Sequence, residues 1–95
     1  MDQQVVNDGD KKKEISFRQL KTIPQPQIGL LIKQLRQEMK LTQEEFSSEC
    51  GVVFSTVNRW EKGHTCPSPM ALKLIALRLS ALGDKGQKLI QTFKT

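Results

Sequence analysis

The chain has 95 residues, which is enough for one domain with a single modest core. No apolar run reaches the roughly 18 residues that a membrane span needs, and the start lacks a signal peptide, so we expect a cytoplasmic protein with no membrane partner. Fifteen Lys and Arg against ten Asp and Glu give a net charge of +5, which fits a polyanionic partner.

Residues 1–23 are predicted to be a flexible N-terminal extension. A run of charged residues from 8 to 14 has little apolar surface to bury. A short strand or turn against the core is expected at three apolar residues, Ile15, Phe17 and Leu20. Pro24 and Pro26 end the extension, because each restricts the backbone of the residue before it.

The first helix is expected to begin with Pro26 as its first residue. Apolar residues then recur at steps of three and four, at Ile28, Leu31, Ile32, Leu35 and Met39. This spacing predicts one buried face of an amphipathic helix.

A second helix is expected to open at Thr42. Thr42 and Glu45 have the spacing of a capping box, in which each side chain bonds the backbone N–H of the other. Phe46 and Cys50, four residues apart, are expected to point inward. Gly51 then suits a left-handed cap that ends the helix.

A third helix is predicted over residues 54–62, with two chemically different faces. The inner face is expected to carry Val53, Val57, Trp60 and Glu61. The outer face is expected to carry Phe54, Ser55, Asn58, Arg59 and Lys62. The inner face is apolar apart from one carboxylate, and the outer face is rich in hydrogen-bond donors.

Two more helices complete the predicted domain. Ser68 caps a helix that starts at Pro69 and ends before Gly83, and the last helix runs over residues 85–93. The longer helix has two apolar stripes, one of Leu72, Ile75, Leu79 and Leu82 and the other of Leu74, Leu77 and Ala81. Five helices and no convincing strand predict an all-α domain over residues 24–95.

Neither a metal centre nor a catalytic site is expected. Cys50, Cys66 and His64 supply three possible metal ligands, whereas a tetrahedral zinc site needs four. The chain has one histidine, no glycine-rich phosphate loop and no cluster of carboxylates. We therefore predict a protein that is not an enzyme and holds no cofactor.

Four short motifs follow one another in a characteristic order: I-K-Q-L-R at 32–36, L-T-Q-E-E-F at 41–46, C-G-V at 50–52 and N-R-W-E-K-G at 58–63. In these motifs residues 28–82 resemble the helix-turn-helix family of phage repressors and Cro proteins, also called the xenobiotic-response-element-like family. The resemblance implies a five-helix, lambda-repressor-like bundle that binds double-stranded operator DNA, commonly as a dimer.

The resemblance also implies roles for individual residues. Gln43 would contact a phosphate and brace the recognition helix, and Arg59 would donate two hydrogen bonds to a guanine. Arg36 and Glu61 would form a structural ion pair. The full set of residues expected to bind DNA is Gln43, Phe54, Ser55, Thr56, Asn58, Arg59 and Lys62.

Two residues depart from the family pattern. Phe54 stands where the family has a polar residue that reads bases, and three roles are open to it: contact with a thymine methyl group, packing against a neighbour, or a partner surface. Ser47 replaces a small apolar residue, so its hydroxyl must donate to a backbone carbonyl near Gln43.

These observations predict a sequence-specific DNA-binding transcriptional regulator that reads the major groove with the helix over residues 54–62. One alternative is the antitoxin of a toxin–antitoxin pair. Another is a coactivator-type interaction module that contacts the transcription machinery and does not bind DNA. We also expect a homodimer through the end of the 69–82 helix and the last helix, with an apolar surface made by Leu74, Leu77, Ala81, Leu89, Ile90 and Phe93. The competing possibility is that the last helix folds back, covers the second apolar stripe and leaves a monomer.

Overall fold

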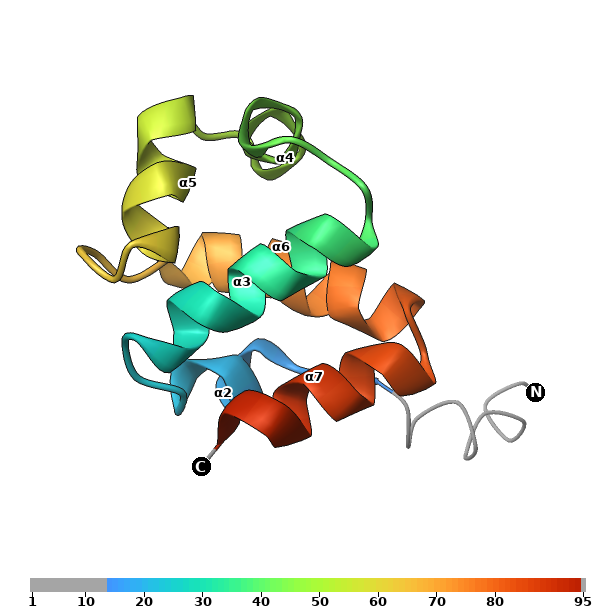
Figure 1. Cartoon of the computed structure of the whole chain (residues 1–95). Helices are drawn as coiled ribbons and strands as arrows, with labels where there is room; N and C mark the ends of the chain where they lie inside the picture. The colour runs from blue at the N-terminus through green and yellow to red at the C-terminus, as the bar shows by residue number, and fades with distance from the viewer. Residues whose placement is uncertain (1–13, 95) are drawn as a thin grey trace.

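The described part of the molecule, residues 14–94 of a computed structural model, contains six α-helices and no strand. They are α2 (Phe17–Lys21), α3 (Gln27–Glu38), α4 (Gln43–Cys50), α5 (Phe54–Glu61), α6 (Pro69–Ala81) and α7 (Asp84–Lys94). Figure 1 shows α4 and α5 at one end of the molecule, α2 and α7 at the other, and α3 and α6 between them. The all-α prediction is confirmed, and α3 to α7 are the five expected helices. Within this range, no helix is long and apolar enough to span a membrane.

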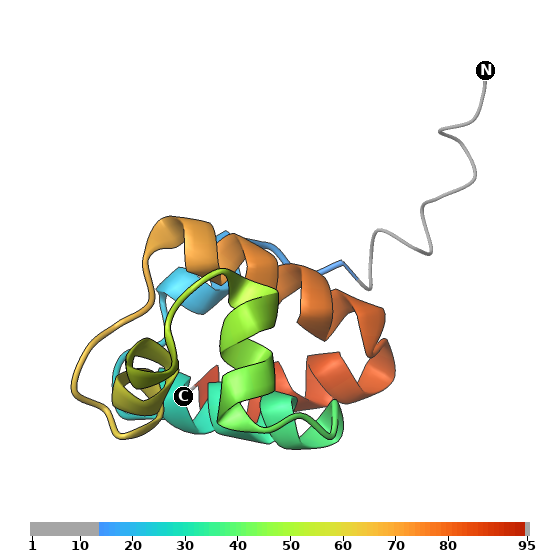
Figure 2. The same ribbon diagram turned by 90° about the horizontal axis from the view of Figure 1, so that it is seen from above.

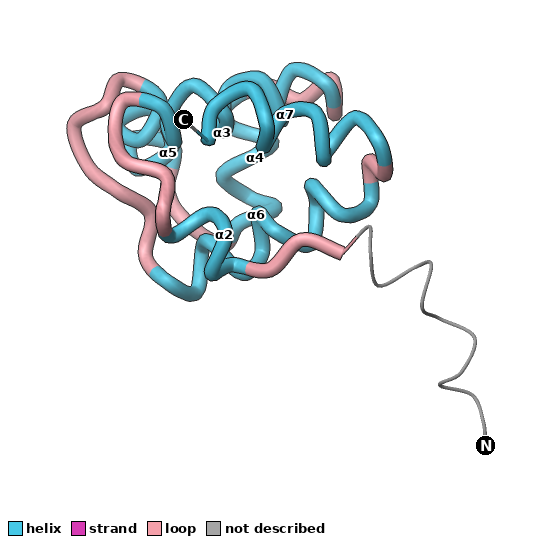
Figure 3. Tube along the Cα trace, turned by 90° about the horizontal axis from the view of Figure 1, so that it is seen from below, coloured by secondary structure: helices cyan, strands magenta, loops and turns pink. Residues whose placement is uncertain are grey.

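The expected strand or turn before Pro24 is instead the short helix α2. Leu20 is 1% exposed, and Ile15 and Ile23 are also buried. The Ile15 N–H donates to the Ser80 hydroxyl of α6 at 2.9 Å, and α2 lies beside α6 (Figure 3). The second half of the predicted extension therefore belongs to the core. The stretch before residue 14, where we expected flexibility, lies outside the described residues.

The core follows the predicted helical periodicity. The apolar face of α3 is buried at Ile28, Leu31, Ile32 and Leu35, with Met39 half-buried at its end. Pro26 is the N-cap of α3 rather than its first residue. Cys50 is buried as expected. Burial raises the pKa of its thiol from 9.0 to about 11, so it stays protonated at neutral pH and packs as a small apolar side chain.

Local capping explains why α4 begins and ends where it does. The Thr42 hydroxyl accepts from the Glu45 N–H at 3.1 Å, and the Glu45 carboxylate accepts from the Thr42 N–H at 2.9 Å. Gly51 ends the helix with φ of +71°, in the left-handed region that glycine tolerates best. The Ser47 hydroxyl donates to the Glu44 carbonyl at 2.7 Å, which is the back-bond that its burial requires. These contacts set the corner between α4 and α5.

The last helix, α7, folds back over the body of the domain. It packs mainly against α3 and less against α6. Ile90 is 1% exposed, and Leu89 and Phe93 are half-buried against the core. Leu77 on α6 remains 66% exposed. The last helix therefore buries its own apolar residues against the core, but it leaves part of the second apolar stripe of α6 exposed.

Candidate functional site

The inner face of α5 anchors this helix in the core. Val57 is fully buried and Trp60 is 3% exposed, as the helical period predicted. Val53 was also expected to point inward, but it is 66% exposed. The reason is that Val53 is the N-cap, with extended backbone angles of φ −82° and ψ 159°, so its side chain does not follow the helical period.

A charged pair joins α3 to the end of α5. Arg36 donates from Nε to Glu61 Oε2 at 2.7 Å and from Nη2 to Oε1 at 3.1 Å. Its Nη1 donates to the Leu41 carbonyl at 3.0 Å. The side chains of Arg36 and Glu61 are only 13% and 4% exposed. These two parallel hydrogen bonds pair a nearly buried carboxylate, whose charge would otherwise destabilise the inner face of α5.

Gln43 extends this pair into a network that reaches from α4 to α5. Its Nε2 donates to Glu61 Oε1 at 3.0 Å, and its Oε1 accepts from Asn58 Nδ2 at 3.2 Å. Asn58, which we expected on the outer face, is half-buried and engaged in this bond. The structure therefore brings four of the predicted site residues together: Arg36, Gln43, Asn58 and Glu61.

The remaining predicted residues are spread along the open side of α5. Ser55, Arg59 and Lys62 are exposed, Phe54 is 47% exposed and Thr56 is half-buried. Seen from above in Figure 2, α4 and α5 are joined by a short turn and lie on the same face of the domain. This face thus presents two cationic side chains and a hydroxyl group on a helix whose inner side is fixed. Their roles toward DNA remain predictions.

A second set of hydrogen bonds, at the opposite end of α3, was not predicted from the sequence. Gln25 Nε2 donates to the carbonyls of Trp60, at 3.1 Å, and Thr65, at 2.6 Å. Its Oε1 accepts from the Gly29 N–H at 3.0 Å. A Cβ at Gly29 would overlap the Trp60 carbonyl, so only glycine lets α3 approach the end of α5 this closely. The end of α5 and the loop after it are therefore tied to the start of α3.

Comparison with known proteins agrees with this architecture. A family model described as helix-turn-helix matches residues 32–80, which include α4, α5 and the network between them. The chain is also similar to the Type II methyltransferase M1.ScrFI of Lactococcus lactis subsp. cremoris, with 35% identity over 52 residues. That match covers 52% of this chain but only 13% of the methyltransferase. No solved structure matches the chain significantly.

The resemblance seen in the sequence motifs is thereby confirmed, because the family model spans about half of the chain and its central helices. A helix-turn-helix places one helix across the DNA backbone and presents the next to the major groove. The positions of α4 and α5 on one face fit this arrangement (Figure 2). The chain belongs to the helix-turn-helix family of DNA-binding domains.

Proposed function

We propose that this protein is a transcriptional regulator that recognises a specific duplex sequence with α5 in the major groove. The observation that carries the proposal is the contrast between the two sides of α5. Its inner side is fixed by the Glu61 network, while Ser55, Arg59 and Lys62 stay exposed. The N-terminus of α4, next to Gln43, would contact a phosphate. Regulation would depend on where the protein binds, because a protein bound at its DNA site blocks or recruits the polymerase.

Arg59 is the residue that we expect to contribute most to sequence preference. Its guanidinium can donate two hydrogen bonds to O6 and N7 of one guanine. Arg59→Ala should weaken binding to the preferred duplex by about 1–3 kcal/mol and relax the preference at one base pair. The preferred duplex would first be selected from random sequences. Titrations of wild type and variant on selected and random duplexes would then measure the change.

Lys62→Ala is the matched control, since it also removes one exposed cation, at the C-cap of α5. Loss of a phosphate contact should weaken binding to both duplexes alike and reduce the salt dependence. Equal affinity of wild type and Arg59→Ala on both duplexes would remove Arg59 from recognition. A folded protein that selects no duplex would contradict the proposed function and favour the role of an interaction module.

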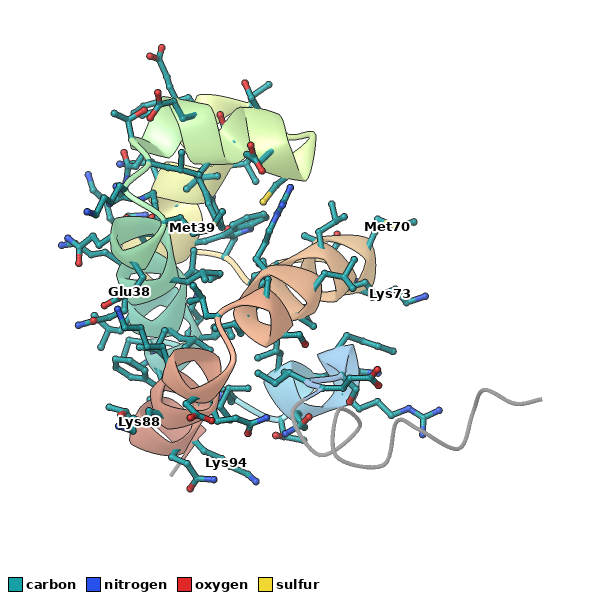
Figure 4. The ribbon with its side chains drawn as sticks, turned by 90° about the vertical axis from the view of Figure 1, so that its right-hand side faces the viewer. Glu38, Met39, Met70, Lys73, Lys88 and Lys94 are labelled. Atoms are coloured by element: carbon teal, nitrogen blue, oxygen red, sulfur yellow. The ribbon has the colours of Figure 1, made fainter. Side chains whose placement is uncertain are left out.

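We further propose that the protein acts as a homodimer through the second apolar stripe of α6, which is formed by Leu74, Leu77 and Ala81. Leu77 is 66% exposed and Ala81 is exposed, while Leu74 is half-buried. At the start of the same helix, Met70 is 69% exposed. Figure 4 shows Met70 projecting outward from α6, on the side of the domain away from α3. Leu89 and Phe93 of α7, which we expected to contribute, are half-buried within the subunit, so the proposed interface now centres on α6.

A dimer would offer two recognition helices to half-sites about 34 Å apart. Sedimentation equilibrium at tens of micromolar should show twice the subunit mass for the free protein, and two subunits plus one duplex when the selected DNA is present. Leu77→Glu should shift the population to monomer, because it places a charge within the apolar stripe. Gln34→Glu adds the same charge at an exposed position of α3 and should leave the dimer intact. A wild-type monomer under both conditions would contradict dimerisation.

A further inference from the structure

The first turn of α5 exposes two adjacent apolar side chains. Val53 is 66% exposed and Phe54 is 47% exposed, whereas Val57 and Trp60 on the same helix are buried. Val53 also occupies a capping position at which Ser, Thr, Asp or Asn is preferred, and it makes no side-chain cap bond. In the free subunit this turn therefore has no side-chain cap and leaves much of both apolar side chains exposed.

The surroundings of Phe54 are open and carry little positive charge. One hollow beside it, of about 530 Å³, is lined by Arg36, Thr42, Gln43 and Glu44. A second hollow, of about 440 Å³, is also lined by Glu44 and by Glu45. Arg36 is already paired with Glu61. The Phe54 ring itself offers no hydrogen-bond donor to a phosphate, so this side chain suits the apolar part of a base edge better than the DNA backbone.

Base edges in the major groove offer one apolar feature. Their other groups are hydrogen-bond donors and acceptors, while thymine also presents its C5 methyl group. An aromatic ring can bury that methyl group and be partly buried by it. Phe54 and Arg59 are both exposed on α5, so both side chains would reach the groove that this helix enters.

We propose that Phe54, flanked by Val53, binds the C5 methyl group of a pyrimidine in the major groove. This inference rests on the proposed function. Thymine and 5-methylcytosine carry the same methyl group, so both bases are ligands of this turn. Five residues of helix span about 7.5 Å and base pairs stack about 3.4 Å apart. The methylated pyrimidine should therefore lie within a few base pairs of the guanine proposed for Arg59.

The test changes one methyl group at a time in the selected duplex. Each thymine is replaced in turn by uracil, which removes only the methyl group. At the one position that Phe54 contacts, wild type should bind the uracil duplex about four-fold more weakly, as burial of one methyl group predicts. Cytosine and 5-methylcytosine placed at that position should show the same four-fold difference in favour of the methylated base.

Variants of Phe54 link the effect to this side chain. Phe54→Gln should bind thymine and uracil duplexes equally, while Phe54→Leu should keep most of the discrimination because it remains apolar. A selected duplex whose affinity is unchanged by every uracil substitution would overturn this inference alone. Discrimination that survives in Phe54→Gln would also overturn it. Failure to select any duplex would overturn the inference together with the proposed function.

Discussion

Replacing Arg36 by methionine is expected to lower the free energy of unfolding by about 3–5 kcal/mol, because it removes the partner of a buried carboxylate. Glu61 is only 4% exposed, so water cannot readily take the place of the guanidinium. Methionine keeps an unbranched stem and thus much of the packing of Arg36. Urea denaturation of the two proteins measures the difference directly.

A double-mutant cycle separates the pair from its surroundings. Arg36→Met, Glu61→Met and the double variant should show strong coupling, with the double variant more stable than Arg36→Met. The matched control is Arg78→Met, which breaks the more exposed pair with Glu49, whose side chains are 45% and 38% exposed. That change should cost at most about 1 kcal/mol. Coupling near zero between Arg36 and Glu61 would mean that each is solvated separately.

Leu20→Ala is expected to destabilise the protein by about 2–5 kcal/mol, although Leu20 lies before the prolines that we took as the domain boundary. Leu20 is 1% exposed in α2, and truncation would leave a cavity against the core. Arg18→Ala changes an exposed residue of the same helix and should have little effect. Thermal and urea unfolding would measure both variants. A loss below about 0.5 kcal/mol for Leu20→Ala, typical of surface substitutions, would show that α2 is not part of the cooperative core.

The helices from α3 to α7 were predictable because each carries a local signal. Thr42 and Ser68 cap helices with their side chains, and the buried residues of α3 recur at helical spacing. Helix α2 was missed because its five residues are too few to show a helical period. The exposure of Val53 was missed because the predicted inner face of α5 was extended one residue beyond the helix, to its N-cap. Helix ends are where such a period stops being informative.

The site was predictable only in part. The family motif pointed to Arg36 and Glu61, and they lie within hydrogen-bonding distance. The bond between Gln43 and Asn58 was not foreseen, because a helical projection of α5 alone does not include the neighbouring helix. Gln25 left no signal at all, since its amide binds backbone carbonyls 35 and 40 residues further along the chain. Every residue has a backbone carbonyl, so no particular side chain in the sequence marks where such a contact will form.

The way α5 is held leaves its exposed side free to change in evolution. Its supports are the Trp60 carbonyl, the inward Val57 and the Glu61 carboxylate, and none of them lies on the exposed side. Exposed positions such as 55, 59 and 62 can therefore change without disturbing the scaffold. Surface substitutions there should be nearly neutral for folding, so if α5 reads DNA as proposed, a descendant of this chain would reach a different DNA target without a large loss of stability.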